Sequence, residues 1–207
     1  MASNRWARQL SGIDRASMGN PSVHLCDYRQ VRLDETDFSA AGSEAASSPA
    51  EFTDTMYADS LCTALVRHIT AASKVSIPKA LAHDRAISMA MAMEDRLMAD
   101  SHNLDDYYEA MGTNEAQFIS ELEDAATKQL ESRAVLLAIA RTEGLEAADA
   151  EYQEEVKRLS ARYPMSVDDL ELFFRQKGED VAIREDISIE KASKFVTDLA
   201  MAQSPAR

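Results

Sequence analysis

The 207-residue sequence lacks several features that identify membrane segments, disulfide frameworks and metal sites. Its two cysteines, Cys26 and Cys62, do not have metal-ligand spacing and are too few for a disulfide framework, so we interpret both as reduced packing residues. No uninterrupted apolar run approaches the roughly 20 residues that cross a bilayer. The first ten residues also lack the apolar core of a signal peptide. These absences predict a cytoplasmic protein.

Basic residues are scarce as well. The chain has 22 Lys and Arg against 36 Asp and Glu, a net charge of -14 that repels both phosphate backbones and anionic lipid surfaces. The sequence therefore predicts neither a nucleic-acid partner nor a membrane partner. No nucleotide loop, nucleophile elbow or zinc spacing occurs, and the four histidines stand apart from one another. We predict no catalytic residue, no metal ligand and no cofactor.

The few glycines and prolines divide the chain near residue 48. Residues 1–47 contain Gly12, Gly19, Gly42 and Pro21 without a sustained helical stripe, which is typical of an irregular or linker-like segment. Apolar residues within 23–33 suggest one strand there, although the sequence reveals no partner strand. Residues 48–202 are predicted to form a separate helical domain.

Within residues 48–202, regular structure is interrupted at few places. Gly112, Gly144 and Gly178 each follow a helical stripe, which is the position where a helix ends in a left-handed residue. Ser48 and Thr113 are expected to cap helix starts through their hydroxyl groups. The patterns predict an all-α chain with helices near residues 48–73, 78–101, 104–111, 113–143, 148–163, 166–177 and 183–199.

Four stretches in collinear order resemble the C-terminal domain of bacterial trigger factor. They are IPKAL at 77–81, LLAIARTEGL at 136–145, MSVDDL at 165–170 and KASKFVTDL at 191–199. A further similarity at 31–38, VRLDETDF, matches the junction that follows the isomerase domain in that family. The resemblance covers about residues 55–200 and implies an extended multi-helix, client-binding arm.

The resemblance implies an ATP-independent chaperone that binds unfolded or nascent polypeptides and supports protein folding and transport. It does not extend to the family's ribosome-docking loop, Gly-Phe-Arg-x-Gly-Lys, which this sequence does not contain. Residues 1–47 are also too few to hold the FKBP-type isomerase domain. We therefore expect a non-enzyme without prolyl isomerase activity. The Thr or Ser that the family uses as a helix cap is replaced by Ala147.

Methionine is concentrated in ISMAMAMEDRLM, residues 87–98. Met89 and Met93 share one helix face, whereas Met91 lies about 200° from Met89, so one narrow stripe cannot hold all three. Either the helix packs on two sides, or one face is open to clients, because flexible thioethers adapt to varied apolar partners. On the second interpretation Met89, Met91, Met93 and Met98 are candidate client-binding residues.

Phe173 and Phe174 are adjacent and hence about 100° apart on a helix. One can pack in a core while the other is exposed, so both are candidate client-binding residues. The last turn before Gly178 is the place where we expect an exposed aromatic side chain.

Three functions from different classes follow from this sequence. The leading hypothesis is a holdase-like chaperone whose apolar grooves bind unfolded polypeptide. The second is a structural or assembly module that uses the same grooves for a fixed partner or a homodimer. The third is an enzyme, for which the sequence offers no catalytic constellation.

Overall fold

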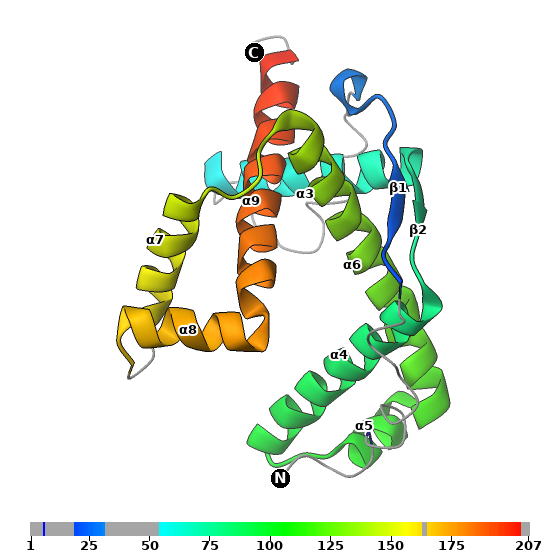
Figure 1. The fold of residues 1–207 in the computed structure, drawn as a ribbon. Coiled ribbons are helices and arrows are strands. Elements are labelled where there is room, and N and C mark those ends of the chain that lie inside the picture. Colours follow the sequence, from blue (N-terminus) through cyan, green and yellow to red (C-terminus); the bar gives the residue numbers. More distant parts are fainter. Residues whose placement is uncertain (1–5, 7–18, 32–53, 163–164, 204–207) are drawn as a thin grey trace. The chain divides into compact units, whose positions relative to one another are not determined.

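The structure is a computed structural model that describes residue 6 and residues 19–31, 54–162 and 165–203. These residues form an all-α chain, as predicted (Figure 1). The elements in chain order are β1 (Ser22–His24), the 3₁₀ helix η2 (Tyr28–Gln30), α3 (Asp54–Ala72), β2 (Lys74–Ser76), α4 (Lys79–Ala99), α5 (Leu104–Met111), α6 (Glu115–Glu143), α7 (Asp149–Ser160), α8 (Val167–Lys177) and α9 (Glu179–Gln203).

The helix ends follow the predicted glycines. Gly112, Gly144 and Gly178 have φ angles of 62°, 65° and 71°, in the left-handed region that favours glycine. The start of α6 corrects one prediction, because Asn114 rather than Thr113 is the cap and its Oδ1 accepts from the Gln117 N–H at 3.0 Å. Asparagine stands directly before the first helical residue and is at least as good a cap as threonine. The predicted cap at Ser48 lies outside the described residues.

The described residues form two compact units, and α6 contributes to both. Unit 1 comprises the described residues within 1–22 and 75–132, and unit 2 those within 23–74 and 133–207. A boundary between an irregular segment and a helical domain at residue 47 stays a prediction.

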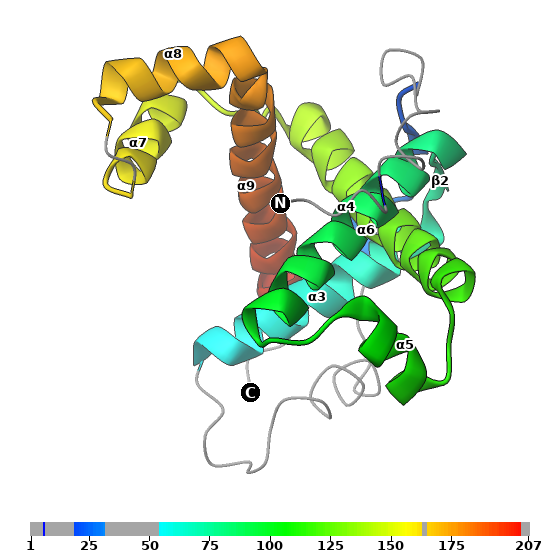
Figure 2. The same ribbon diagram turned by 90° about the horizontal axis from the view of Figure 1, so that it is seen from below.

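Unit 1 has α4, α5 and the first part of α6 in succession (Figure 2). Its core is one buried cluster, to which each helix contributes two side chains and to which residue 6 adds an indole ring. The members are Trp6, Ile87, Ala90, Leu104, Tyr108, Phe118 and Ile119. The Tyr108 and Phe118 rings lie 5.5 Å apart between centroids, a favourable separation for aromatic packing.

In unit 2, α9 contacts α3, α7, α8 and η2. Helix α8 follows α7 and leads into α9, so that the three helices make two successive corners (Figure 1). A buried cluster of Tyr152, Val156, Leu170 and Phe174 joins α7 to α8. Ala192 and Val196 are buried on α9.

Of the described residues within 23–33, where the sequence suggests one strand, only Val23 and His24 belong to β1. β1 ends at His24 and pairs with β2 in a two-stranded sheet, and β2 is the partner that the sequence did not reveal. The strand does not continue because Asp27 begins a turn, in which its carbonyl accepts from the Gln30 N–H at 3.1 Å. The side chains of the same two residues are joined at 2.6 Å.

Residues 26–29 are fastened to the rest of unit 2 by side-chain hydrogen bonds. Arg29 Nη2 donates to both carboxylate oxygens of Glu143, at 2.7 and 2.8 Å, and the Tyr28 hydroxyl donates to the same group. The Cys26 N–H donates to Ser73 Oγ at 3.1 Å. Hydrogen bonds from Tyr28 and Arg29 lower the pKa of Glu143 below its ordinary value. The ionised carboxylate therefore stabilises this contact.

We predict that Glu143→Gln destabilises the protein at pH 7 by about 1 kcal/mol, a modest value because the Arg29 side chain is 61% exposed. Because the pKa of Glu143 is lower in the folded state, the stabilisation is complete at pH values above the pKa of the unfolded state, about 4.3. It is lost as the pH falls from there through the folded-state pKa. Urea unfolding at pH 7 and pH 3 should show the difference shrinking at pH 3. Glu146→Gln, three residues away, is the matched control and should have little effect at either pH. A difference of equal size at both pH values would contradict this account.

Candidate functional site

The α6–α7 corner in unit 2 lacks a conventional side-chain cap, because alanine occupies both 147 and 148. The Leu145 N–H donates to the Ala140 carbonyl at 2.7 Å, which closes the end of α6. The Glu151 carboxylate accepts from the Ala148 N–H at 2.8 Å and so satisfies an amide at the start of α7. One half of a capping box is therefore present without the hydroxyl half.

Helix α9 supplies a hydroxyl to a different amide of the same corner. Ser188 Oγ accepts from the Ala147 N–H at 3.0 Å and donates to the Arg184 carbonyl at 2.7 Å, and Ser188 is buried. Lys191 Nζ donates to Glu151 at 2.9 Å and to the Glu146 carbonyl at 3.2 Å. The hydrogen bond from Ala148 and the contact with Lys191 lower the pKa of Glu151. The corner is thus fixed by residues about 40 positions further along the chain.

A cavity of about 400 Å³ lies beside this corner, between the end of α6 and the beginning of α9. Its wall combines short apolar side chains with ionic ones: Leu137, Ala140, Arg141, Glu146, Ala147, Val181, Arg184, Glu185 and Ser188. The cavity is therefore amphipathic.

Two of the charged wall residues are held by neighbours within unit 2. Arg184 pairs with Asp149 at 2.8 Å, and its guanidinium carbon lies 4.4 Å from the centre of the Tyr152 ring. Glu185 pairs with Arg133 at 2.8 Å. These contacts fix α9 against α6 and α7 beside the cavity.

Exposed large apolar side chains are concentrated around α8 and the beginning of α9. Eight are exposed among the described residues, and five of them fall within 165–181: Met165, Val167, Leu172, Phe173 and Val181. We call these five the exposed apolar set. Val181 also lines the cavity, so the set and the cavity share a residue.

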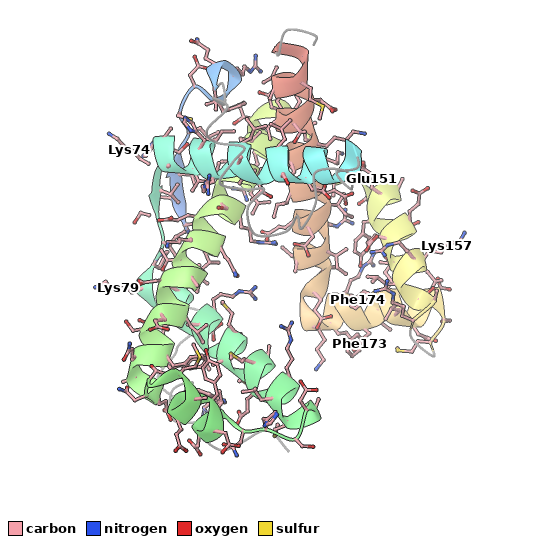
Figure 3. All side chains as sticks on the ribbon, turned by 180° about the vertical axis from the view of Figure 1, so that it is seen from behind. Lys74, Lys79, Glu151, Lys157, Phe173 and Phe174 are labelled. Atoms are coloured by element: carbon pink, nitrogen blue, oxygen red, sulfur yellow. The ribbon has the colours of Figure 1, made fainter. Side chains whose placement is uncertain are left out.

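The exposure on α8 follows from its position in unit 2. Leu170 and Phe174 are buried one turn apart and define its inward face. At about 100° per residue, Leu172 lies opposite that face and Phe173 lies on its flank. Val167 falls on the inward side of the helix, but it is the first residue of α8 and is 38% exposed. Lys177 Nζ lies 6.0 Å from the centre of the Phe173 ring. Figure 3 shows Phe173 and Phe174 side by side on α8.

The structure separates the two phenylalanines singled out from the sequence. Phe174 is 5% exposed and packs in the α7–α8 cluster, whereas Phe173 is 39% exposed in the last turns before Gly178. Leu172 and Val181, which are 55% and 57% exposed, were not among the candidates. The i to i+4 spacing of Leu170 and Phe174 would have placed Leu172 on the outward face, had those two been recognised as the buried pair.

The candidate methionines belong to unit 1 and have different environments. Met91 and Met93 pack against the cluster that contains Trp6, which accords with the packing interpretation for these two. Met89 is half-buried and Met98 is 46% exposed. Their role in client binding stays a prediction.

Features of other chemistry are absent from the described parts of the chain. No group of three or more His, Cys, Asp or Glu residues there is arranged to hold a metal ion. Among the described helices, none has the length and apolar character needed to cross a membrane.

Comparisons with known proteins place these features in a family. The family described as "Bacterial trigger factor protein (TF) C-terminus" matches residues 51–198. Trigger factor of Halalkalibacterium halodurans is 28% identical over 140 residues, which is 68% of this chain and 32% of that protein. Trigger factor of Bacillus subtilis is 28% identical over 126 residues, 61% of this chain and 29% of that protein. The chain thus spans about a third of the length of the curated relatives it matches.

A solved structure also matches, with a TM-score of 0.44, 17% identity, and coverage of 70% of this chain and 34% of that one. It is described as "Promiscuous Substrate Recognition in Folding and Assembly Activities of the Trigger Factor Chaperone".

We predict that Ser188→Ala destabilises unit 2 by about 1–2 kcal/mol, because the Ala147 N–H loses its acceptor in a partly buried position. Thr142→Ala removes an exposed hydroxyl that bonds only its own helix, and should change stability by less than about 0.5 kcal/mol. Urea unfolding and hydrogen exchange at the Ala147 amide measure the two effects. Equal stability of the two variants, with unchanged exchange at Ala147, would show that Ser188 does not fix this corner.

Proposed function

The chain belongs to the family of the bacterial trigger factor C-terminus, and on that premise we propose that it is an ATP-independent chaperone that binds unfolded polypeptide. The observation that carries the proposal is the exposed apolar set. Apolar side chains that remain exposed on a protein surface commonly mark the place where a partner binds. Binding places the set, together with the adjoining cavity, against apolar side chains of a client.

The set suits weak binding of many different sequences. Burial of apolar surface contributes about 25 cal/mol per Å², and much of this is offset by the cost of ordering a mobile client. The exposed side chains include no specific hydrogen-bonding group, so discrimination between client sequences is low. Phe173 supplies the aromatic contact, and Phe174 contributes by holding α8 in place.

The acidic surface accompanies this role. A net charge of -14 keeps chaperone molecules apart in solution although each exposes apolar side chains. Self-association through the exposed apolar set is the competing use of this surface, and it would mark an assembly module. Light scattering separates the two, since a chaperone that is free to meet clients remains monomeric at working concentrations.

The direct test is suppression of aggregation by the triple variant Leu172→Ser, Phe173→Ser, Val181→Ser. Since all three side chains are exposed, we expect little change in stability. We expect the concentration that halves aggregation of a chemically unfolded client to rise about tenfold, equivalent to about 1.4 kcal/mol of lost apolar contact. Nucleotide should have no effect.

Met111→Ser is the matched control, because Met111 is 63% exposed but belongs to unit 1. It should retain the activity of the unaltered chain. If the triple variant and the control suppress aggregation equally well, clients do not bind the exposed apolar set.

A further inference from the structure

Trp6 is the sole tryptophan of the chain and occupies an unusual position in unit 1. It is 2% exposed, and its Nε1–H donates to Glu94 Oε2 at 2.7 Å across 88 positions of sequence. The residues that surround it in the buried cluster all come from one continuous stretch, 87–119. The cluster is therefore a site made by α4, α5 and α6 into which a distant part of the chain inserts one large side chain.

The contacts of Trp6 have the chemistry of ligand recognition. An aromatic anchor enters an apolar site, and a single hydrogen bond to a charged acceptor fixes its orientation. Phe118, Tyr108 and Ile87 supply the buried walls, and Met91 and Met93 pack against the same cluster. We call this site, formed by 87–119 with Glu94 as its acceptor, the indole site. Thioether side chains at its border allow it to accommodate a ring in more than one setting.

Charge favours a basic segment at this site. Residues 75–132 contain 12 Asp and Glu against four Lys and Arg, and in the sequence Trp6 is flanked by Arg5 and Arg8. Opposite charges attract the two parts of the chain beyond the range of direct contact, and salt weakens this attraction.

We propose that the indole site is a binding site for a tryptophan-bearing polypeptide segment, and that Trp6 occupies it as an intramolecular competitor. The proposal deepens the proposed function and rests on it, because an unfolded client is the source of the competing tryptophan. A client that supplies one displaces Trp6. Trp6 then regulates access to the indole site.

Competition within one chain sets the affinity that a client needs. Trp6 belongs to the same chain as the indole site and competes at an effective concentration of about 1 mM. The apparent affinity of the site for an external segment is its intrinsic affinity multiplied by the fraction of time that Trp6 is absent. Single tryptophan segments at low concentration compete poorly.

The first experiment measures binding of a dye-labelled peptide of residues 1–12 to the full chain and to Trp6→Ala. We expect the variant to bind at least about tenfold more tightly, because its indole site is vacant. A peptide with phenylalanine in place of tryptophan should bind the variant about tenfold more weakly, because Glu94 lacks a donor. That preference should vanish in Trp6→Ala, Glu94→Leu. Equal binding by the full chain and Trp6→Ala, or binding to neither, overturns the proposal.

The second experiment needs no substitution that removes core volume, and it decides the matter if Trp6→Ala does not fold. With 5-fluorotryptophan incorporated, the chain has a single fluorine resonance, since it has one tryptophan. Adding the unlabelled peptide to roughly 5 mM, several times the effective concentration, should replace the buried resonance by a solvent-exposed one. A peptide with alanine at position 6 should leave it unchanged.

A resonance that stays buried with both peptides shows that Trp6 is a fixed part of the core and overturns the proposal. Aggregation suppression by the unaltered chain distinguishes the two levels of failure. If it persists while the resonance is unmoved, the proposed function stands and this inference alone is wrong.

Discussion

Helix α9 is the constraint on which unit 2 depends. It is 25 residues long, about 37 Å at 1.5 Å per residue, and it contacts α3, α7, α8 and η2. Its buried residues pack in the interior, while Ser188 accepts from the Ala147 N–H and Lys191 donates to Glu151 and to the Glu146 carbonyl at the α6–α7 corner. The course of α7, and with it the cavity beside α9, is therefore set by a helix that follows it in sequence.

The exposed apolar set is a consequence of this architecture. Helix α8 has one partner face, occupied by Leu170 and Phe174, and no described element of unit 2 buries Leu172 on the opposite side. An amphipathic helix on a protein surface normally carries polar residues there. Leucine at this position is 55% exposed and adds little to the stability of unit 2, which is the physical reason why the proposed binding surface includes it.

The sequence was informative where the determining physics is local. Gly112, Gly144 and Gly178 were identified as helix ends because a left-handed residue is needed at each, and the need is visible within one turn. Thr113 and Asn114 are adjacent and both can cap a helix, so the sequence does not decide which of them caps α6. Three features could not be predicted from a local pattern, because each joins residues that are 41 to 88 positions apart. They are the pairing of β1 with β2, the hydrogen bond from Ala147 to Ser188 and the insertion of Trp6. The sequence predicted that one of Phe173 and Phe174 can be exposed, but not which one, because the burial of Phe174 follows only once α7 is in place.

Photo-crosslinking from position 172 tests most directly whether the outward face of α8 binds unfolded chains. A photoreactive amino acid replaces Leu172 in one protein and Met111 in another, and each is irradiated with the same client in its unfolded and native states. The account predicts adducts from position 172 with the unfolded client, few with the native client and few from position 111. Adducts of equal yield with unfolded and native client, or from both positions alike, would contradict it.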